Sequence, residues 1–135
     1  MIKLSDLKEG DFVVAVYEGQ QTPGQVKELN REDKEVCITT DVQDFWFKPE
    51  ELFPIPLDDR ELMKLNFSRQ QNDDGSVKYS KGAFRLLIPA NGSFNDFEMW
   101  YREDRRHITH PIAVHELQNH YSQMTKVHLT DEIMA

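Results

Sequence analysis

The chain of 135 residues contains one cysteine and no long apolar run. A single thiol, Cys37, cannot form a disulfide within the chain or build a zinc site from several cysteines. Its place inside the apolar run 36–38 predicts a packed thiol. A membrane-spanning helix needs about 18 consecutive apolar residues, and no segment approaches that length. Because Met1 is followed by a polar segment without the apolar stretch of a signal peptide, we expect a cytoplasmic protein.

Basic residues are also scarce, since 16 Lys/Arg stand against 24 Asp/Glu and leave a formal net charge of −8. This charge disfavours bulk DNA and anionic membranes as partners. Residues 1–56 hold six Lys/Arg and twelve Asp/Glu, whereas residues 57–135 hold ten and twelve. The acidity is therefore mostly N-terminal, and an anionic ligand is expected to meet the C-terminal half.

Short strands separated by turn residues dominate the first half of the chain. The β-forming segments are 12–17, 24–29, 35–40 and 43–47, and a single helical turn follows at 49–52. Four or five short strands within so few residues predict a small curled barrel.

The order Leu7-x-x-Gly10-Asp11-x-Val13, followed by two hairpins and a helical turn, resembles an SH3-like barrel. The resemblance implies an acidic SH3-like β-barrel over residues 1–57. Barrels of this kind serve as docking modules for RNA, peptides or proteins, or as structural caps. The acidic charge of this one disfavours RNA.

The second half, 58–135, predicts an α+β unit in which an antiparallel meander is packed by a short helix and a C-terminal helix. A capping-box pattern at Asp58 to Glu61 predicts the short helix over 59–65. The strands are expected at 67–70, 77–80, 83–88, 97–101 and 105–109. The last helix is expected to begin at His110-Pro111, with proline at its first position, and to reach Lys126. Its apolar stripe consists of Val114, Leu117, Tyr121 and Met124.

Four of the five histidines lie within residues 107–120, which raises the question of a metal site. His115 and His120 are five positions apart, so on a helix their rings point about 140° apart and cannot share one zinc ion. No acidic or cysteine spacing adds ligands to His107 and His110. We therefore predict no metal and no cofactor.

A histidine general base is the chemistry of a hydrolase, and His110 or His115 could act in this way with Glu116 or Asp104. The rest of an active site is missing, because the chain has no Gly-rich phosphate loop, no serine nucleophile motif and no cysteine paired with these histidines. We therefore expect no catalytic residues.

Arginines next to aromatic residues suggest nucleotide or single-stranded nucleic-acid binding. Three arginines lie within 102–106, directly after Trp100-Tyr101. Strand alternation puts Trp100 on the face opposite Met99 and Tyr101. Core packing therefore explains the aromatic residues on at least one of these two faces. The acidic residues Glu103 and Asp104 also offset the arginines.

Three segments together resemble a group of small proteins of Bacteroidetes-type bacteria, their phages and mobile elements. They are the Pro-Ile-Pro-Leu run at 54–57, the aromatic strand at 97–101 and the V-H-x-L-Q-N-x-Y motif at 114–121. The resemblance covers nearly the whole chain and implies the two-part fold without implying an activity. His120 departs from the group, since an apolar residue is usual there.

We predict a non-enzymatic cytoplasmic binding or adaptor protein, encoded by a phage or mobile element, that recognises a host protein. The expected binding residues are Trp46, Trp100, Arg102, Arg106, His107 and His115. The first alternative is a nucleotide or nucleic-acid binding protein that uses the arginines and aromatic residues. The second is a hydrolase with a histidine general base. The sequence does not predict the oligomeric state.

Overall fold

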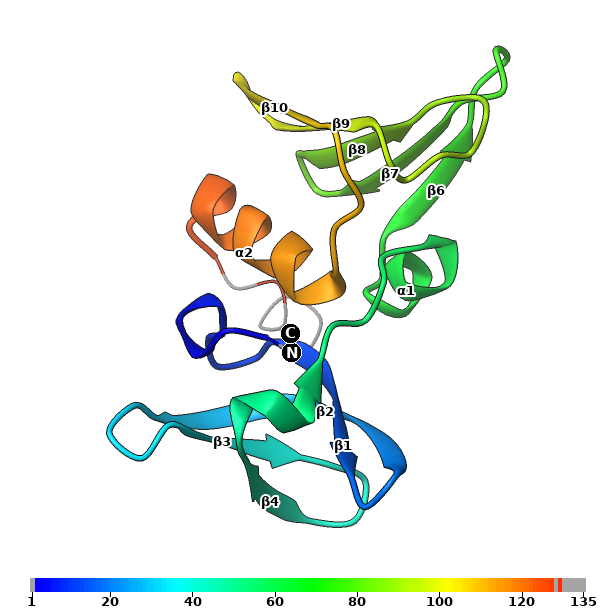
Figure 1. Ribbon diagram of the computed structural model, residues 1–135. Helices are drawn as coiled ribbons and strands as arrows, with labels where there is room; N and C mark the ends of the chain where they lie inside the picture. Colours follow the sequence, from blue (N-terminus) through cyan, green and yellow to red (C-terminus); the bar gives the residue numbers. More distant parts are fainter. Residues whose placement is uncertain (1, 128, 130–135) are drawn as a thin grey trace. The chain divides into compact units, whose positions relative to one another are not determined.

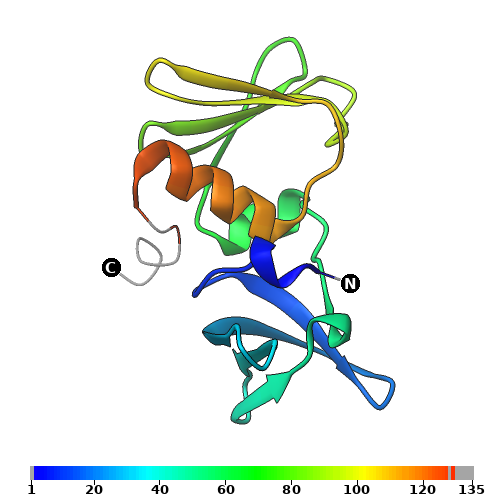
Figure 2. The same cartoon turned by 60° about the vertical axis from the view of Figure 1, so that its left-hand side comes forward.

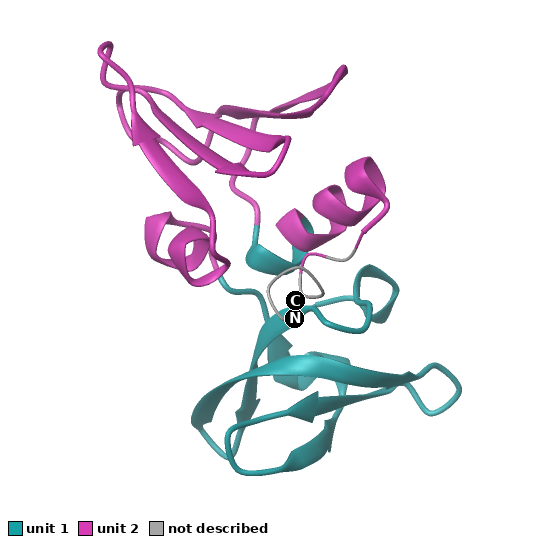
Figure 3. Cartoon of the chain, turned by 180° about the vertical axis from the view of Figure 1, so that it is seen from behind, with its two compact units in different colours: residues 1–55, 113–116 teal, residues 56–112, 117–135 magenta. Residues whose placement is uncertain are grey.

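The computed structural model describes residues 2–127 and 129, which form two compact units (Figure 3). Unit 1 comprises residues 1–55 and 113–116, and unit 2 comprises residues 56–112 and 117–135. Each unit contains one five-stranded antiparallel sheet, so the predicted α+β class is confirmed. No helix within 2–127 and 129 is long and apolar enough to cross a membrane.

The N-terminal part of unit 1 contains five strands and two short 3₁₀ helices (Figure 1). In chain order these are η1 (Leu4–Asp6), β1 (Phe12–Tyr17), β2 (Gln20–Asn30), β3 (Glu35–Thr39), β4 (Asp44–Phe47), η2 (Pro49–Glu51) and β5 (Leu52–Phe53). The strand order is β4-β3-β2-β1-β5. A closed barrel has no edge strands, whereas β4 and β5 are both edges of this sheet. The sheet is therefore open, and the predicted SH3-like barrel is not confirmed.

Strand β2 is longer than the predicted segment 24–29, because its first half pairs with only one neighbour. Residues 20–24 pair with β1, and pairing with β3 begins at Gln25. Pro23 is therefore tolerated, since no β3 residue needs its missing N–H group. A Cβ on Gly24 would lie 2.3 Å from Cγ2 of Ile38 and 2.9 Å from the carbonyl oxygen of Thr39. Only glycine lets β2 pass this close to β3.

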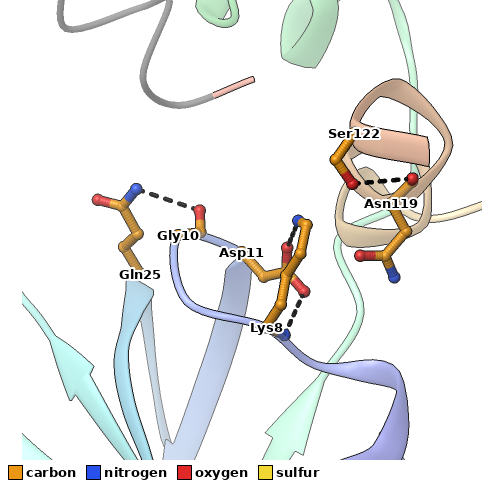
Figure 4. Close-up of polar contacts among 6 residues, drawn as sticks. All are labelled: Lys8, Gly10, Asp11, Gln25, Asn119 and Ser122. Atoms are coloured by element: carbon orange, nitrogen blue, oxygen red, sulfur yellow. Dashed lines mark hydrogen bonds and ion pairs between the residues drawn. The ribbon is translucent and has the colours of Figure 1, made fainter. Parts of the chain in front are cut away.

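The core of unit 1 lies on one face of this sheet, as period-two alternation predicts. Its buried members come from all five strands and from the N-terminal segment: Ile2, Leu7, Val13, Ala15, Val26, Val36, Ile38, Phe47 and Leu52. Cys37 is also buried, which confirms the predicted packed thiol. The turn before β1 is tied to β2, since Gln25 donates a hydrogen bond from Nε2 to the carbonyl oxygen of Gly10 over 3.1 Å (Figure 4).

Unit 2 contains the second sheet and two α-helices. In chain order these are α1 (Asp59–Lys64), β6 (Ser68–Gln71), β7 (Val77–Lys81), β8 (Phe84–Ile88), β9 (Phe97–Tyr101), β10 (Asp104–Ile108) and α2 (Val114–Thr125), whose first turn belongs to unit 1. The strand order β10-β9-β8-β7-β6 is a simple meander, as predicted. Asp58 caps α1 by accepting a hydrogen bond from the backbone N–H of Glu61 over 2.9 Å, which confirms the predicted cap.

Both helices cover the same face of the second sheet (Figures 1 and 2). The rings of Phe84 on β8 and Tyr121 on α2 meet edge to face at 4.9 Å, and Phe84 is fully buried. The predicted apolar stripe of α2 is confirmed, because Val114, Leu117, Tyr121 and Met124 are all buried. The opposite face of the sheet, called the outer face below, carries the alternate residues of each strand.

The predicted start of the last helix at His110-Pro111 is wrong, because α2 begins at Val114. The preceding residues are extended: the N–H of Leu57 donates to the carbonyl oxygen of Ile112, and the N–H of Val114 donates to that of Ile55. These backbone bonds compete with a helical turn. Glu116 then supplies a cap, since its Oε1 accepts the N–H of Ala113 over 2.9 Å.

Candidate binding groove

A groove of about 540 Å³ opens on unit 1. Its walls come from the β1–β2 hairpin on one side and from the β3–β4 turn and β4 on the other. The apolar lining residues are Ala15, Tyr17, Val42, Phe45, Trp46 and Phe47, and three uncharged polar residues, Gln20, Thr22 and Thr40, complete it. The groove size lies within the range of small-ligand pockets, roughly 300–1,000 Å³.

The partner change of β2 explains why the groove exists. Up to Gly24 the strand pairs with β1 alone, so Thr22 has no β3 residue beside it. The next element, β3, ends at Thr39 and is followed by a tight turn in which Thr40 donates from Oγ1 to the carbonyl oxygen of Gln43 over 2.8 Å. The face of the open sheet that carries the core is thus left uncovered between the first half of β2 and the end of β3.

Large apolar side chains are exposed around this groove. Val42 is 85% exposed, Tyr17 59%, Trp46 47% and Phe45 40%. The ring of Phe45 packs near that of Phe47, a buried core residue, and the two ring centres lie 6.3 Å apart. Single exposed apolar residues are ordinary, but four around one concavity form a candidate binding surface.

Three residues that line the groove have an acidic residue directly beside them in the sequence. Tyr17 is followed by Glu18, Val42 is preceded by Asp41, and Phe45 is preceded by Asp44. Lys27 Nζ lies 2.6 Å from Oδ2 of Asp44 and lowers the pKa of that carboxyl group. Within residues 2–127 and 129, neither Glu18 nor Asp41 has an ion-pair partner.

The lining is uncharged. None of the nine residues is a histidine, cysteine, serine, lysine or carboxylic acid. Its chemistry consists of aromatic surface with hydroxyl and amide groups at the margin.

Two of the six residues predicted for binding belong to unit 1. Trp46 lines the groove. His115, on the first turn of α2, is only 5% exposed, and its Nδ1 is buried without a hydrogen-bond partner. It is therefore a core residue and does not present a recognition surface.

His115 lies in a buried electrostatic cluster with Asp11 and Lys8. Asp11 is fully buried and accepts hydrogen bonds from the backbone N–H of Lys8 over 3.0 Å and from Lys8 Nζ (Figure 4). Burial raises the pKa of Asp11, and the contacts with Lys8 oppose this shift. Burial lowers the pKa of His115, against the opposing charges of Asp11, Glu116 and Asp6. Burial thus favours the neutral form of His115 in the folded unit.

The other four predicted residues belong to unit 2 and do not form one site. Trp100 and His107 lie on the outer face, where His107 Nε2 contacts Oδ1 of Asp96 at 2.6 Å, and this carboxylate raises the pKa of His107. Arg106 points to the opposite face and is bonded to α2. Arg102 sits in the β9–β10 turn with φ of 54° and stacks on Tyr101 at 5.0 Å. In residues 2–127 and 129, no three His, Cys, Asp or Glu residues group as metal ligands.

Sequence reasoning identified Trp46 but missed Tyr17, Val42 and Phe45. A local signal existed, because each is a large apolar residue next to an acidic one in a strand end or turn. Their convergence depends on the partner change of β2, which no local pattern reveals.

The chain matches no family model, no curated protein and no solved structure.

Proposed function

We propose that the chain is a non-enzymatic cytoplasmic binding protein whose groove in unit 1 takes an extended segment of a host protein. The observation that carries the proposal is the gathering of Tyr17, Val42, Phe45 and Trp46 around one groove. Covering apolar surface of this kind is favourable, because it removes that surface from water. In this role unit 1 acts as an SH3-like docking module that is open at one side. The resemblance to proteins of phages and mobile elements supplies the setting in which a host protein is the partner.

An extended segment fits because β4 is both a wall of the groove and an edge strand. One side of β4 has no neighbouring strand within the described part of unit 1, so its backbone groups are open to an added strand. Strand addition supplies affinity through main-chain hydrogen bonds and specificity through alternate side chains that enter a pocket.

The charge of unit 1 favours a basic segment. Residues 1–56 carry twice as many acidic as basic residues. Glu18 and Asp41, the sequence neighbours of the lining residues Tyr17 and Val42, have no ion-pair partners among the described residues. Complementary charge raises the association rate and rejects acidic competitors. We therefore expect an apolar anchor with lysine or arginine nearby in the partner segment.

Selection from a phage-displayed library of random twelve-residue peptides on the purified full chain tests this proposal. The expected peptides share an apolar residue flanked by lysine or arginine. Their binding is followed through Trp46 fluorescence in the Trp100→Phe variant, in which Trp46 is the remaining tryptophan. Failure to enrich any peptide, or enrichment of acidic peptides that leave Trp46 fluorescence unchanged, contradicts the proposal.

A further inference from the structure

Three side chains form a ladder across the outer face of unit 2. Arg85 on β8, Trp100 on β9 and Arg105 on β10 are direct cross-strand partners. The guanidinium carbon of Arg85 lies 4.7 Å from the centre of the Trp100 ring, and that of Arg105 lies 5.6 Å from it. A half-buried tryptophan thus lies within cation–π distance of two arginines.

Stacking leaves most of the hydrogen-bonding capacity of these arginines unused. A guanidinium contacts a ring through its flat face, whereas its five N–H donors lie in the plane. Arg85 makes no ion pair or side-chain hydrogen bond with the described residues, and its Nε is buried without a partner. Among residues 2–127 and 129, the only ion pair of Arg105 is a long contact, 3.8 Å from Nε to Oε2 of Glu98. The ladder therefore presents cations whose donors have few acceptors among the described residues.

The charge of this part of the face is opposite to that of the whole chain. Lys78, on β7, pairs with Leu87 and lies on the same face as Arg85. These cations stand against one carboxylate, Glu98, on a chain of net charge −8. The other end of the face is acidic, because Asp74 and Asp96 line a shallow hollow there. The basic area is thus restricted to the ladder and its neighbours.

We propose that the ladder of Arg85, Trp100 and Arg105, with Lys78, binds a short stretch of single-stranded nucleic acid. Phosphate oxygens match the Nη donors of the arginines in paired hydrogen bonds. A base stacks on the Arg105 guanidinium, since this side chain is 66% exposed and its guanidinium carbon lies 5.6 Å from the centre of the Trp100 ring. A carboxylate ligand would accept hydrogen bonds from the arginines but has no aromatic ring to stack on Arg105. The bases of a duplex are paired and stacked within it, so none is available to stack on Arg105. This surface and the groove of unit 1 are independent proposals.

Fluorescence anisotropy of a labelled ten-nucleotide uridine oligomer, titrated with the full chain, tests the proposal. With two or three phosphate contacts, affinity is expected to fall roughly tenfold between 50 and 200 mM salt, because the slope for single strands is about −0.7 per contact. Arg85→Gln is expected to weaken binding at least fivefold. Arg60→Gln removes the same charge from an exposed position on α1 and is expected to change affinity less than twofold.

Two further measurements keep the test decisive. Lys78→Gln, at the margin of the ladder, is expected to weaken binding two- to threefold even if Arg85→Gln does not fold. Unlabelled uridine monophosphate and a ten-base-pair duplex are expected to compete at least tenfold less well than the unlabelled oligomer. The proposal is overturned by absence of binding at 50 mM salt, by equal losses in Arg85→Gln and Arg60→Gln, or by equal competition from the mononucleotide or the duplex.

Discussion

Arg106 donates a hydrogen bond from Nη1 to Nδ1 of His120 over 2.7 Å, and this contact joins β10 to α2 within unit 2. The same Nη1 donates to Oε1 of Gln123 over 2.9 Å. Because the arginine can only donate, Nδ1 of His120 is the acceptor and carries no proton. Two neighbouring turns of the helix are thus held by one side chain of the sheet.

Replacing Arg106 by methionine is expected to destabilise unit 2 by about 1–2 kcal/mol, since it keeps the apolar stem but removes both hydrogen bonds. Urea unfolding followed through Trp100 fluorescence in a Trp46→Phe background measures the change. Arg102→Met is the matched control, because the only side-chain interaction of Arg102 with the described residues is its contact with the Tyr101 ring, and a shift below about 0.5 kcal/mol is expected. Equal losses in the two variants would show that the contacts with α2 contribute nothing.

The stability of unit 1 is expected to fall in mild acid because of His115. Burial lowers the pKa of His115 below its usual value of 6.5, so the unfolded chain binds this proton more readily than the folded unit. Stability is then greatest above pH 6.5 and decreases as the pH falls through 6.5 toward the lower folded-state value. Asp11 acts in the opposite sense at lower pH, because its raised pKa favours the folded unit as the pH falls toward 3.8.

The His115→Leu variant, compared with the parent by urea unfolding at pH 7.5 and 5.5, isolates this effect. Both carry Trp100→Phe, so that Trp46 reports on unit 1. The variant is expected to lose less stability than the parent between these two pH values, whatever its absolute stability. A variant that retains the full acid-dependent loss would mean that another group causes it.

Gly24 is expected to be intolerant of a side chain. The Cβ of alanine would clash with the buried methyl group of Ile38 and approach the backbone of Thr39, and forcing atoms into a packed site costs about 1–3 kcal/mol. Gly24→Ala is therefore expected to lower the urea midpoint of unit 1, whereas Gln21→Ala, at an exposed position of the same strand, is expected to change it little. A Gly24→Ala variant as stable as Gln21→Ala would show that β2 and β3 are not held this closely.

Local patterns in the sequence were sufficient for much of unit 2. Its meander follows from alternation and turn residues, and the stripe Val114 to Met124 follows from helical periodicity. The start of α2 was not predictable in this way, because backbone bonds of Ile112 and Val114 to residues 55–57, far away in the sequence, replace the first helical turn.

Long-range pairing also limited the prediction of sites. Pro23 ends a strand in any local interpretation, yet β2 continues through it because β3 is not paired there. The groove arises from this same arrangement. Whether Arg106 faces solvent or α2 depends on the register of β10 with β9 and on His120, which lies fourteen residues away.

The most direct test of the groove compares Phe45→Ala with Phe53→Ala. The two phenylalanines are 40% and 39% exposed and lie on the two edge strands of unit 1, but only Phe45 lines the groove. The measurement is the dissociation constant of the best selected peptide by isothermal titration calorimetry. Phe45→Ala is expected to weaken binding at least tenfold, because truncating an anchoring aromatic residue costs about 2 kcal/mol of binding free energy. Phe53→Ala is expected to weaken binding less than twofold. Equal affinity of the two variants would contradict the account.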